Sequence, residues 1–349
     1  MTDSTAALIP SLATPDSLRI LSGMRPTGRL HLGHKKGVLD NWVQLQKEHT
    51  CWFFAADWHA LTTDYANPDI VKNTIWEMIV DWLAVGIDPE QSVIFIQSEV
   101  PAHAELHLLF SFITPLAWLE RVPTYKDQIE KLREKDLGTY GFLGYPLLQA
   151  ADILLYRADA VPVGEDQVPH VELTREVARR FNHLYRKPEQ PLFPEPKQLL
   201  MPASKLPGLD GQKMSKSYGN TIELSEEWKT TEKKVKTMPT DPARVRRDDP
   251  GNPERCPVWE FHKVYSSEEE RSEVAAGCTS ASIGCLDCKK VLLSHLEAEL
   301  QPIRTRRIEI AAHIDDVHDI VKQGNAKARE EASRTMEKVR RTLKMGYRV

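Results

Sequence analysis

The sequence of 349 residues has no apolar run that approaches the roughly 20 residues needed to span a membrane. Its start also lacks the basic segment before an apolar stretch that marks a signal peptide. Internal repeats and long low-complexity tracts are missing as well. With mixed charges and 41% hydrophobic residues, these absences exclude a membrane protein. They favour a globular protein of the cytoplasm that is long enough for two domains.

A strong net charge is also missing, because the formal net charge is only -4. The distribution is uneven, however, and the chain from residue 226 onward, above all Lys322 to Val349, is richer in Lys and Arg than the rest. A basic segment of this kind predicts a polyanionic partner. A solvated helix face would produce the same composition, and both interpretations stay open.

Cysteine is scarce, and the five residues are an odd number. Cys51 stands alone in the apolar run "CWFFAA", which is the usual setting of a buried thiol. The other four follow the spacing C-x21-C-x6-C-x2-C. In a protein of the cytoplasm such a cluster favours metal over disulfides, and four thiolates can hold zinc or an iron–sulfur cluster. The spacing alone favours zinc. The four candidate ligands are Cys256, Cys278, Cys285 and Cys288.

Apolar periodicity predicts the organisation of the first hundred residues. Three buried strands (17–23, 50–57 and 92–98) alternate with two helices (31–46 and 67–84). This alternation is typical of an α/β fold with a Rossmann-like, doubly wound parallel sheet. Ligands of such sheets bind at the carboxyl ends of the strands.

The remaining chain is mainly helical in its pattern. Residues 102–141 are charged and helical and are expected to be an insertion. A helix starting at Tyr145, a strand over 158–164 and a long helix to Tyr185 should complete the sheet domain. Beyond Leu224 the pattern predicts helices, the last of them basic and running from about Ala326 to Gly346.

The stretch "RPTGRLHLGH" follows the first predicted strand. Its Pro-Thr-Gly turn leads directly into a helix, whose free N–H groups suit a phosphate. His31 and His34 are three residues apart, so both face the same side of the first turn. Gly33 leaves room for a flat group to approach the backbone. Taken alone, the stretch fits phosphate binding and a purely structural role equally well.

The stretch "GQKMSKSYG" carries Lys213 and Lys216 in a loop flanked by glycines. Such a loop can move, and two ammonium groups on it can close over a triphosphate and neutralise departing pyrophosphate. A solvated lysine loop is the plain alternative for an isolated pair of this spacing.

Together, the two motifs carry a specific resemblance. His31-Leu32-Gly33-His34 followed much later by an intact KMSKS resembles the signature of class I aminoacyl-tRNA synthetases, whose usual first motif is HIGH. The stretches "GMRPTG", "FFAADWHALTT" and "YPLLQAADILLYRADAVPVGEDQVPHVELTREVARRFN" resemble those of tryptophanyl-tRNA synthetases. This resemblance runs from Leu21 to the C-terminus. It implies an HIGH/KMSKS-type site on the Rossmann-like sheet, plus a C-terminal α-helical domain.

The resemblance implies a tryptophan site. Asp152 would accept the indole N–H, and a buried carboxylate left unpaired by a wrong ligand is a strong selector. Tyr145 and Gln167 would hold the ammonium group of L-tryptophan. Gln149 lies one helical turn before Asp152 and faces the same pocket. Many bacterial tryptophanyl enzymes have Met at the position of Gln149, so its contact to the amino acid is open.

The resemblance also implies an ATP site, with Mg²⁺ carried on the phosphates. His31, His34, Lys213, Lys216 and Lys126 are the expected catalytic groups, with Lys126 as a third cation for the leaving group. Asp166 would bind the ribose, and the backbone of Leu206 the adenine. The role of Arg25 stays open between the nucleotide and the substrate. The residues assigned to ATP are Arg25, Pro26, Thr27, Gly33, His34, Gly164, Glu165, Asp166, Leu206, Lys213, Met214, Ser215, Lys216 and Ser217.

A subset of this family carries a nearly identical four-cysteine motif that binds a [4Fe–4S] cluster. The resemblance therefore shifts the expected ligand of the four cysteines from structural Zn²⁺ to [4Fe–4S]. Lys289 and Lys290 follow the last cysteine and would either reach tRNA or offset the thiolate charge. A structural role beside RNA fits better than redox catalysis, because the family binds the anticodon in this half.

The resulting hypothesis is a tryptophan–tRNA ligase with tRNA(Trp), L-tryptophan and ATP as partners, a homodimer, and no membrane contact. A tyrosyl-tRNA synthetase, a small nucleotidyltransferase and a non-catalytic RNA-binding paralogue are the alternatives. The domain prediction is as follows: a flexible N-terminus 1–16, a catalytic domain 17–225 with a dimerisation insertion 102–141 and a KMSKS loop 204–220, and an anticodon-binding domain 226–349.

Overall fold

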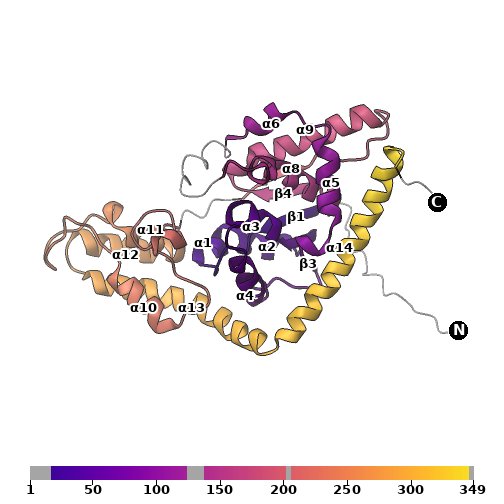
Figure 1. Ribbon diagram of the computed structural model, residues 1–349. Coiled ribbons are helices and arrows are strands. Elements are labelled where there is room, and N and C mark those ends of the chain that lie inside the picture. Colours follow the sequence, from indigo (N-terminus) through magenta and orange to yellow (C-terminus); the bar gives the residue numbers. More distant parts are fainter. Residues whose placement is uncertain (1–16, 124–136, 202–205, 346–349) are drawn as a thin grey trace.

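The computed structural model describes residues 17–123, 137–201 and 206–345. Within them, parallel strands form a sheet in the order β3-β2-β1-β4-β5 (Figure 1). The strands are β1 (Arg19–Met24), β2 (Thr50–Ala55), β3 (Ser92–Ile96), β4 (Ala160–Val163) and β5 (Lys197–Leu200). The sequence-based prediction of a doubly wound parallel sheet is confirmed.

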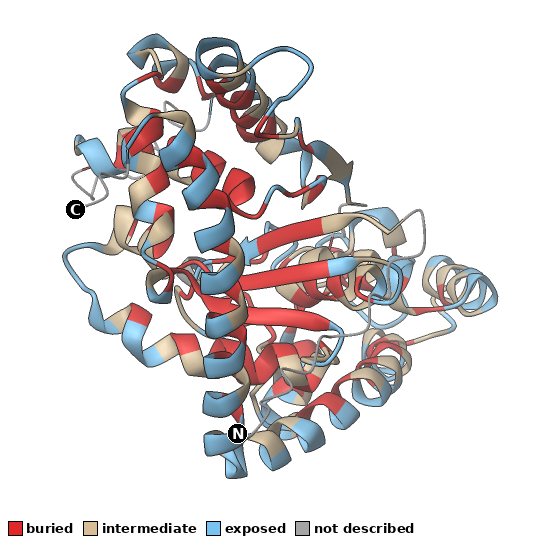
Figure 2. Cartoon of the chain, turned by 90° about the vertical axis from the view of Figure 1, so that its right-hand side faces the viewer, coloured by how far each residue is buried: buried red, intermediate tan, exposed pale blue. Residues whose placement is uncertain are grey.

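The central strands are apolar because both faces of the sheet are covered. Alternate residues of each strand enter two different core clusters: Phe54 and Phe95 belong to one, whereas Phe53 and Ile94 belong to the other. Figure 2 shows the strands as buried along most of their length, with exposed surface on the helices around them. Because it is packed on both faces, the sheet gives rigid support to a site at the carboxyl ends of its strands.

Helices of the first half cross over between β1, β2 and β3. They are α1 (Leu32–His34), the π-helix η1 (Lys35–Leu39), α2 (Asp40–Leu45), α3 (Asp57–Asp64), α4 (Asp69–Val85) and the 3-10 turn η2 (Gln97–Glu99). The predicted helix 31–46 is present but contains a π segment. The second strand ends at Ala55, earlier than expected, because Asp57 begins α3.

Helices predominate in the described parts of residues 102–185. The elements are α5 (Ala102–Ser111), α6 (Leu116–Glu120), α8 (Tyr140–Leu155), the 3-10 turn η3 (Glu165–Gln167) and α9 (Val168–Tyr185). Helix α8 begins five residues before the predicted start at Tyr145. Its first residue follows Thr139, whose side chain accepts a hydrogen bond from Phe142 N–H and so caps the helix.

The C-terminal region consists of helices and short turns. Its elements are the 3-10 turn η4 (Lys216–Tyr218), α10 (Trp228–Thr237), the 3-10 turn η5 (Pro253–Arg255), α11 (Pro257–Tyr265), α12 (Glu268–Thr279), α13 (Cys285–Ala312) and α14 (Ile314–Thr342). Leu292, Leu296 and Leu300 of α13 share a core cluster with the sheet. No helix of the described residues is both long and apolar enough to cross a membrane.

The last helix lies along the open edge of the sheet. Figure 1 shows α14 returning from the C-terminal helices to run past β3 and α5. Asn325 Oδ1 accepts a hydrogen bond of 2.9 Å from Ile96 N–H, and Gly324 lies directly against the carbonyl group of Ile94. Helix α14 begins at Ile314, twelve residues before the predicted start at Ala326. An exposed strand edge is thereby covered by the chain itself.

Candidate active site

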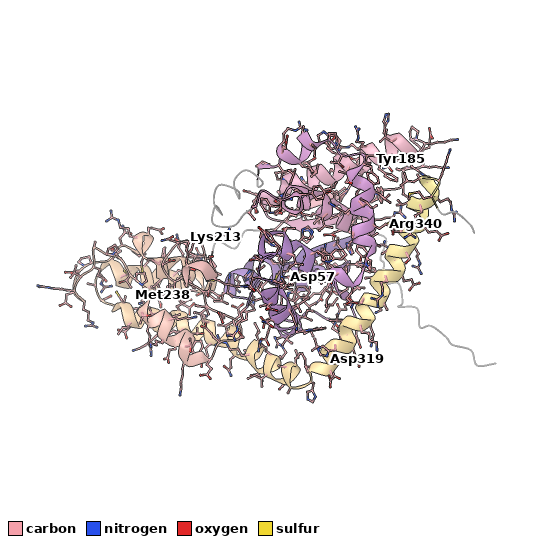
Figure 3. All side chains as sticks on the ribbon, viewed as in Figure 1. Asp57, Tyr185, Lys213, Met238, Asp319 and Arg340 are labelled. Carbon is pink, nitrogen blue, oxygen red and sulfur yellow. The ribbon has the colours of Figure 1, made fainter. Side chains whose placement is uncertain are left out.

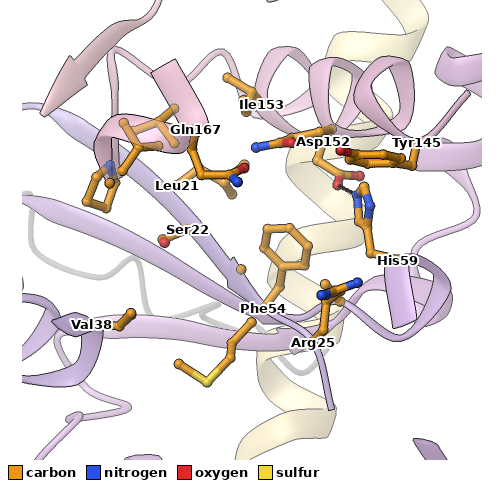
Figure 4. A pocket seen from close by; sticks show the side chains of 18 of the residues that line it. Leu21, Ser22, Arg25, Val38, Phe54, His59, Tyr145, Asp152, Ile153 and Gln167 are labelled. Carbon is orange, nitrogen blue, oxygen red and sulfur yellow. Dashed lines mark hydrogen bonds and ion pairs between the residues drawn. The ribbon is translucent and has the colours of Figure 1, made fainter. Parts of the chain in front are cut away.

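A cavity of about 420 Å³ opens at the carboxyl ends of β1, β2 and β4 (Figure 4). This position follows the rule for doubly wound sheets. Backbone and side chains of the β1 end form one side of the cavity, and α8 forms another. Several residues predicted for the site line it: Arg25, Thr27, His34, Tyr145, Gln149, Asp152, Gly164 and Gln167.

The two motif histidines cap the turn that they share. His31 Nδ1 accepts a hydrogen bond of 3.2 Å from Gly33 N–H, and His34 Nδ1 accepts one of 3.3 Å from His31 N–H. The ring centroids are 3.8 Å apart. A neutral imidazole that accepts at Nδ1 carries its proton at Nε2. The backbone of the turn thus selects the Nε2–H tautomer of both rings.

Both rings are held in the neutral form. Burial, and then the ammonium group of Lys216, lowers the pKa of His31 to about 4. Burial, His31 and Lys216 lower the pKa of His34 well below its usual value. The site therefore offers two uncharged N–H donors at neutral pH, which suits hydrogen bonding to an anionic group.

The KMSKS segment lies against the histidine turn. The backbone joins them, because Leu32 N–H donates to Ile222 O at 3.0 Å and Leu224 N–H donates to Leu30 O at 3.0 Å. A side chain at Gly28, whose φ is +123°, would lie 3.0 Å from Lys216 Nζ. The two sequence motifs are therefore brought together as predicted from their pairing.

The lysines of this segment differ in their surroundings. Burial lowers the pKa of Lys216, although Glu223 and Asp81 oppose that effect. Lys213 is exposed, and Figure 3 labels it beside the C-terminal helices. Met214 is buried and faces Gly33, and Ser215 N–H donates to Asn220 Oδ1 at 2.8 Å. Ser217 belongs to η4, but its side chain lies outside the described part.

Asp152 is the most densely bonded carboxylate of the cavity and is only 1% exposed. Its Oδ2 lies 2.7 Å from His59 Nε2, and its Oδ1 lies 2.6 Å from His103 Nδ1. Gln97 Nε2 donates to both oxygens, at 2.8 and 3.0 Å. Burial alone would raise the pKa of Asp152. His59 and His103, through their charge and hydrogen bonds, outweigh it and bring the pKa down to about 2.

A second hydrogen-bond network lies beside His59, whose ring centroid is 6.5 Å from that of Tyr145. His170 Nδ1 is 2.8 Å from Gln149 Oε1, and His170 Nε2 is 3.5 Å from the hydroxyl oxygen of Tyr145. Burial and the charge of His59 lower the pKa of His170 to about 4. A neutral His170 then donates to Gln149 Oε1, which turns the amide N–H groups of Gln149 away from His170.

The remaining predicted ATP residues are dispersed. Gly164, Glu165 and Asp166 form an exposed rim, where Asp166 Oδ2 accepts from Gln167 Nε2 at 3.1 Å. Pro26 O accepts from the Thr74 hydroxyl group. The side chain of Leu206 packs in the core and does not line the described cavity. Lys126 lies outside the described residues.

Comparison with known proteins decides the family. The model of the family "tRNA synthetases class I (W and Y)" matches residues 14–301. A tryptophan–tRNA ligase of Thermotoga maritima is 56% identical over 95% of this chain and all of its own length. One of Ralstonia nicotianae is 51% identical over 94% of this chain and 99% of its own.

The chain belongs to the class I tryptophanyl-tRNA synthetases.

A solved structure agrees with this assignment. Tryptophanyl-tRNA synthetase from Campylobacter jejuni, crystallised with ADP and tryptophan, has a TM-score of 0.83 and 31% identity. The match covers 94% of this chain and all of that one. A tyrosyl-tRNA synthetase from Archaeoglobus fulgidus, at 24% identity and a TM-score of 0.63, shares the fold alone. The tyrosyl alternative is therefore not favoured.

In this synthetase the four clustered cysteines line one small cavity, formed by the loop after α10, the start of α11, the end of α12 and the first turn of α13. Burial and then the three other thiols raise the pKa of Cys288 to about 12, and Cys288 Sγ lies 3.3 Å from His262 Nε2. Across the described ranges, however, no group of three or more His, Cys, Asp or Glu side chains is arranged to bind a metal ion. The thiols converge, and the ligand of the synthetase at this position stays a prediction.

The two lysines after the cysteine motif have different environments. Lys289 is 3% exposed, and its ammonium group donates to Lys236 O and Met238 O at 2.8 and 2.6 Å. Lys290 is exposed and pairs with Asp287. Only Lys290 of this pair is positioned to meet a partner at the surface.

Several polar side chains of the synthetase site escaped the sequence analysis. His59 and Gln97 follow β2 and β3 at the carboxyl ends of the strands, and that position was an available signal. His103, Tyr156 and His170 are on helices and carry no comparable signal. They are found only because the fold brings α5, α8 and α9 together.

Proposed function

We propose that the cavity at the carboxyl ends of β1, β2 and β4 is where this synthetase activates tryptophan with ATP. The observation that carries the proposal is the contact between the two motifs, with Lys216 beside Gly28 and close to both histidines. The motif contact supports phosphate binding by these groups next to the cavity that holds Asp152. As a tryptophan–tRNA ligase, the enzyme then transfers the activated amino acid to tRNA.

The amino-acid end of the cavity is assigned to Asp152, Tyr145, Gln149 and Gln167. Asp152 would accept the indole N–H, since it is ionised and buried. Tyr145 and Gln167 would bind the ammonium group, and the amide N–H groups of Gln149 would face the ligand. Apolar side chains such as Phe54 complete the lining, as Figure 4 shows.

The ATP end is assigned to the histidine turn, the KMSKS segment and the rim at Gly164 to Asp166. The tryptophan carboxylate is already a nucleophile and attacks the α-phosphorus, so the first step needs no general base. Catalysis then rests on positioning and charge neutralisation. His31 and His34 would donate from Nε2, and Lys213, Lys216 and Lys126 would neutralise the departing pyrophosphate. Mg²⁺ would be coordinated mainly by the phosphate oxygens of ATP.

In the second step the 2′-hydroxyl group of the terminal adenosine of tRNA(Trp) would attack the aminoacyl carbonyl carbon. Residues 226–349 are proposed to bind the anticodon, on the grounds of their basic composition. Residues 17–225 are proposed as the catalytic domain. The cytoplasm is the proposed location, since tRNA and ATP are used there.

The four cysteines are proposed to hold a [4Fe–4S] cluster, with Zn²⁺ as the alternative, in a structural role near the RNA. Their shared cavity supports this, as do Arg244 and Lys289, two buried cations that donate only to carbonyl groups and a thiol. Iron and acid-labile sulfide should be measured on protein purified without oxygen. One tightly bound zinc with no iron would overturn the cluster assignment.

A homodimer is proposed through the insertion 102–141. An exposed apolar patch on α5, α6 and α8 supports it, because large apolar patches on a protein surface mark interaction sites. The patch comprises Leu108, Phe112, Leu116 and Tyr140, each more than half exposed.

The deciding experiment is ATP–pyrophosphate exchange with tryptophan, tyrosine or neither amino acid. We expect exchange with tryptophan alone, and exchange with tyrosine but not tryptophan would overturn the proposal. The Asp152→Ala variant should lose tryptophan-dependent exchange by about 100-fold or more while retaining its circular dichroism spectrum. Normal tryptophan affinity in this variant would refute the role of Asp152.

A further inference from the structure

Two buried side chains form hydrogen bonds with Asp152 on the side away from the cavity. Gln97 and His103 are both 0% exposed, and neither lines the cavity, whereas Asp152 and His59 do. Figure 4 shows the Asp152–His59 pair at the cavity wall. Gln97 Nε2 spans both carboxylate oxygens, and His103 Nδ1 meets Oδ1 at 2.6 Å. The carboxylate is thus fixed from behind by two donors.

The His103 contact is itself oriented by Tyr156. The carboxylate of Asp152 only accepts, so His103 Nδ1 carries the proton and donates. Its Nε2 lies 2.8 Å from the hydroxyl oxygen of Tyr156, so this contact fixes the ring from its other nitrogen. Asp152 lies in the last turn of α8, and Tyr156 follows that helix directly, so the end of one helix presents both ends of the Tyr–His–Asp chain.

The Gln97 contact has a visible cost to the fold. Within the described parts of the chain, Gln97 Oε1 is buried and has no hydrogen-bond partner. An orphaned buried acceptor is unfavourable, and such groups are rare in native structures. A residue such as Met would fill the same space without this penalty. The amide is therefore present for its donor, which is directed at Asp152.

We infer that Gln97 and His103 are positioning residues that keep Asp152 as a fixed, ionised acceptor and so set the selectivity of the pocket for an indole N–H. The inference rests on the proposed role of Asp152 in binding tryptophan. A carboxylate without these donors would take up a proton in its buried site. It would then offer a hydroxyl group to the ligand in place of an acceptor, and selection for the N–H would fall.

The expected pH dependence follows from the groups around Asp152. Those that face it are His59 from α3, His103 and His107 from α5, and Tyr156 from α8. Loss of a donor to the carboxylate, above all His103, raises the pKa of Asp152 above its low value. Tryptophan affinity should then decrease as the pH is lowered from 8 to 5.5, whereas the unaltered enzyme should show no such decrease from this group.

The test uses full-length Gln97→Met and His103→Phe enzymes in ATP–pyrophosphate exchange. Each is assayed with tryptophan and with β-(3-benzothienyl)alanine, in which sulfur replaces the indole N–H. We expect KM for tryptophan to rise about tenfold, with kcat within about threefold, and the preference for tryptophan over the analogue to fall about tenfold. Tyr156→Phe should change both in the same direction by a smaller factor.

Gln46→Met is the matched control. Gln46 is also buried, and its amide binds Gly86 O and Asp88 N–H away from the cavity. This variant should be less stable. It should keep the preference of the unaltered enzyme for tryptophan over the analogue, and the same pH dependence of tryptophan affinity.

The outcomes separate this inference from the proposed function. If the unaltered enzyme exchanges with tryptophan, the function stands whatever the variants do. Unchanged preference and pH profile in Gln97→Met and Tyr156→Phe would then overturn the positioning role. Those two variants decide the question even if His103→Phe does not fold. No exchange by the unaltered enzyme with tryptophan would instead remove the proposed function, on which this inference rests.

Discussion

The two motif histidines are uncharged at neutral pH, because their pKa values are lowered in the folded protein. A lowered pKa makes the free energy of unfolding depend on pH. In the unfolded chain His31 takes up a proton near pH 6.5, whereas in the folded protein its pKa is about 4. The unfolded state therefore gains protons first as the pH falls. The stabilisation that is complete above pH 6.5 is lost progressively down to about pH 4.

A His31→Asn variant should reveal this contribution, because Asn can still cap the turn but does not titrate. We expect the loss of unfolding free energy between pH 7 and pH 5 to be about 2 kcal/mol smaller in the variant. Urea denaturation at the two pH values measures it. Equal pH dependence in both proteins would contradict a depressed pKa at His31.

Single residues were predictable where a motif or a position rule marked them. Asp152 and the two histidines stood in recognisable stretches, and the structure places Asp152 and His34 on the cavity. The supporting donors were not predictable, because His103 and Gln97 are 49 and 55 residues from Asp152 in sequence. They reach Asp152 only because α5 and η2 lie next to α8 in the fold. The side chain of Leu206 packs in the core, and its backbone contact to adenine stays a prediction.

At the scale of elements, helix α13 links the cysteine cavity to the turn of His31 and His34. Its first turn carries two of the cysteines. Further along, Glu299 Oε1 binds the ammonium groups of Lys35 and Lys36, which follow His34 directly. Arg304 then donates to Glu223 O and Leu224 O, in the strand-like segment that follows KMSKS. One helix thus contacts both motif segments.

A Glu299→Gln variant should show how strongly this link stabilises the protein. Lys35 is largely buried and keeps only Asp40 as a charged partner in the variant. Removal of one partner from a buried pair is costly, so we expect the free energy of unfolding to fall by about 2 kcal/mol. Chemical denaturation at pH 7 measures it, with Glu337→Gln, from an exposed pair with Arg341, as the near-neutral control.

Helices and strands were predictable from the sequence where their apolar pattern matches the face that the fold buries. Strands β1 to β4 are apolar runs, and their helices have an apolar face, so this part of the sheet could be derived directly. Strand β5 (Lys197–Leu200) contains no buried residue, carries no such pattern and was not predicted. The start of α14 could not be, because the pair Gly324-Asn325 normally indicates a turn. In the structure these residues are inside the helix: the glycine permits contact with β3, and the asparagine bonds to its edge.

At the scale of the whole molecule, the contact between α14 and β3 should be sensitive to a single methyl group. A side chain at Gly324 would overlap the carbonyl oxygen of Ile94, which is backbone and cannot move aside. We expect Gly324→Ala to destabilise the protein by about 3 kcal/mol. Gly141→Ala is the control, because nothing lies near that position in α8, and it should stabilise by about 0.5 kcal/mol. Thermal denaturation distinguishes the two.

The proposed dimer makes a separate prediction. Phe112 is 71% exposed at the end of α5, and a buried glutamate at an apolar interface is unfavourable. Phe112→Glu should therefore shift the protein toward the monomer in sedimentation velocity, by about tenfold or more in dissociation constant. The Ile308→Glu variant, exposed on α13 outside the patch, should sediment as the unaltered protein does.

The helix that closes the edge of the sheet also sets an order of events during synthesis. Ile96 and Asn325 are 229 residues apart, so a ribosome adding about 5 to 20 residues per second needs more than ten seconds between them. For that interval β3 presents an unpaired backbone edge to every neighbouring nascent chain. A chain released before α14 emerges keeps that edge open and is prone to aggregation, so premature termination should yield insoluble protein instead of a shortened enzyme.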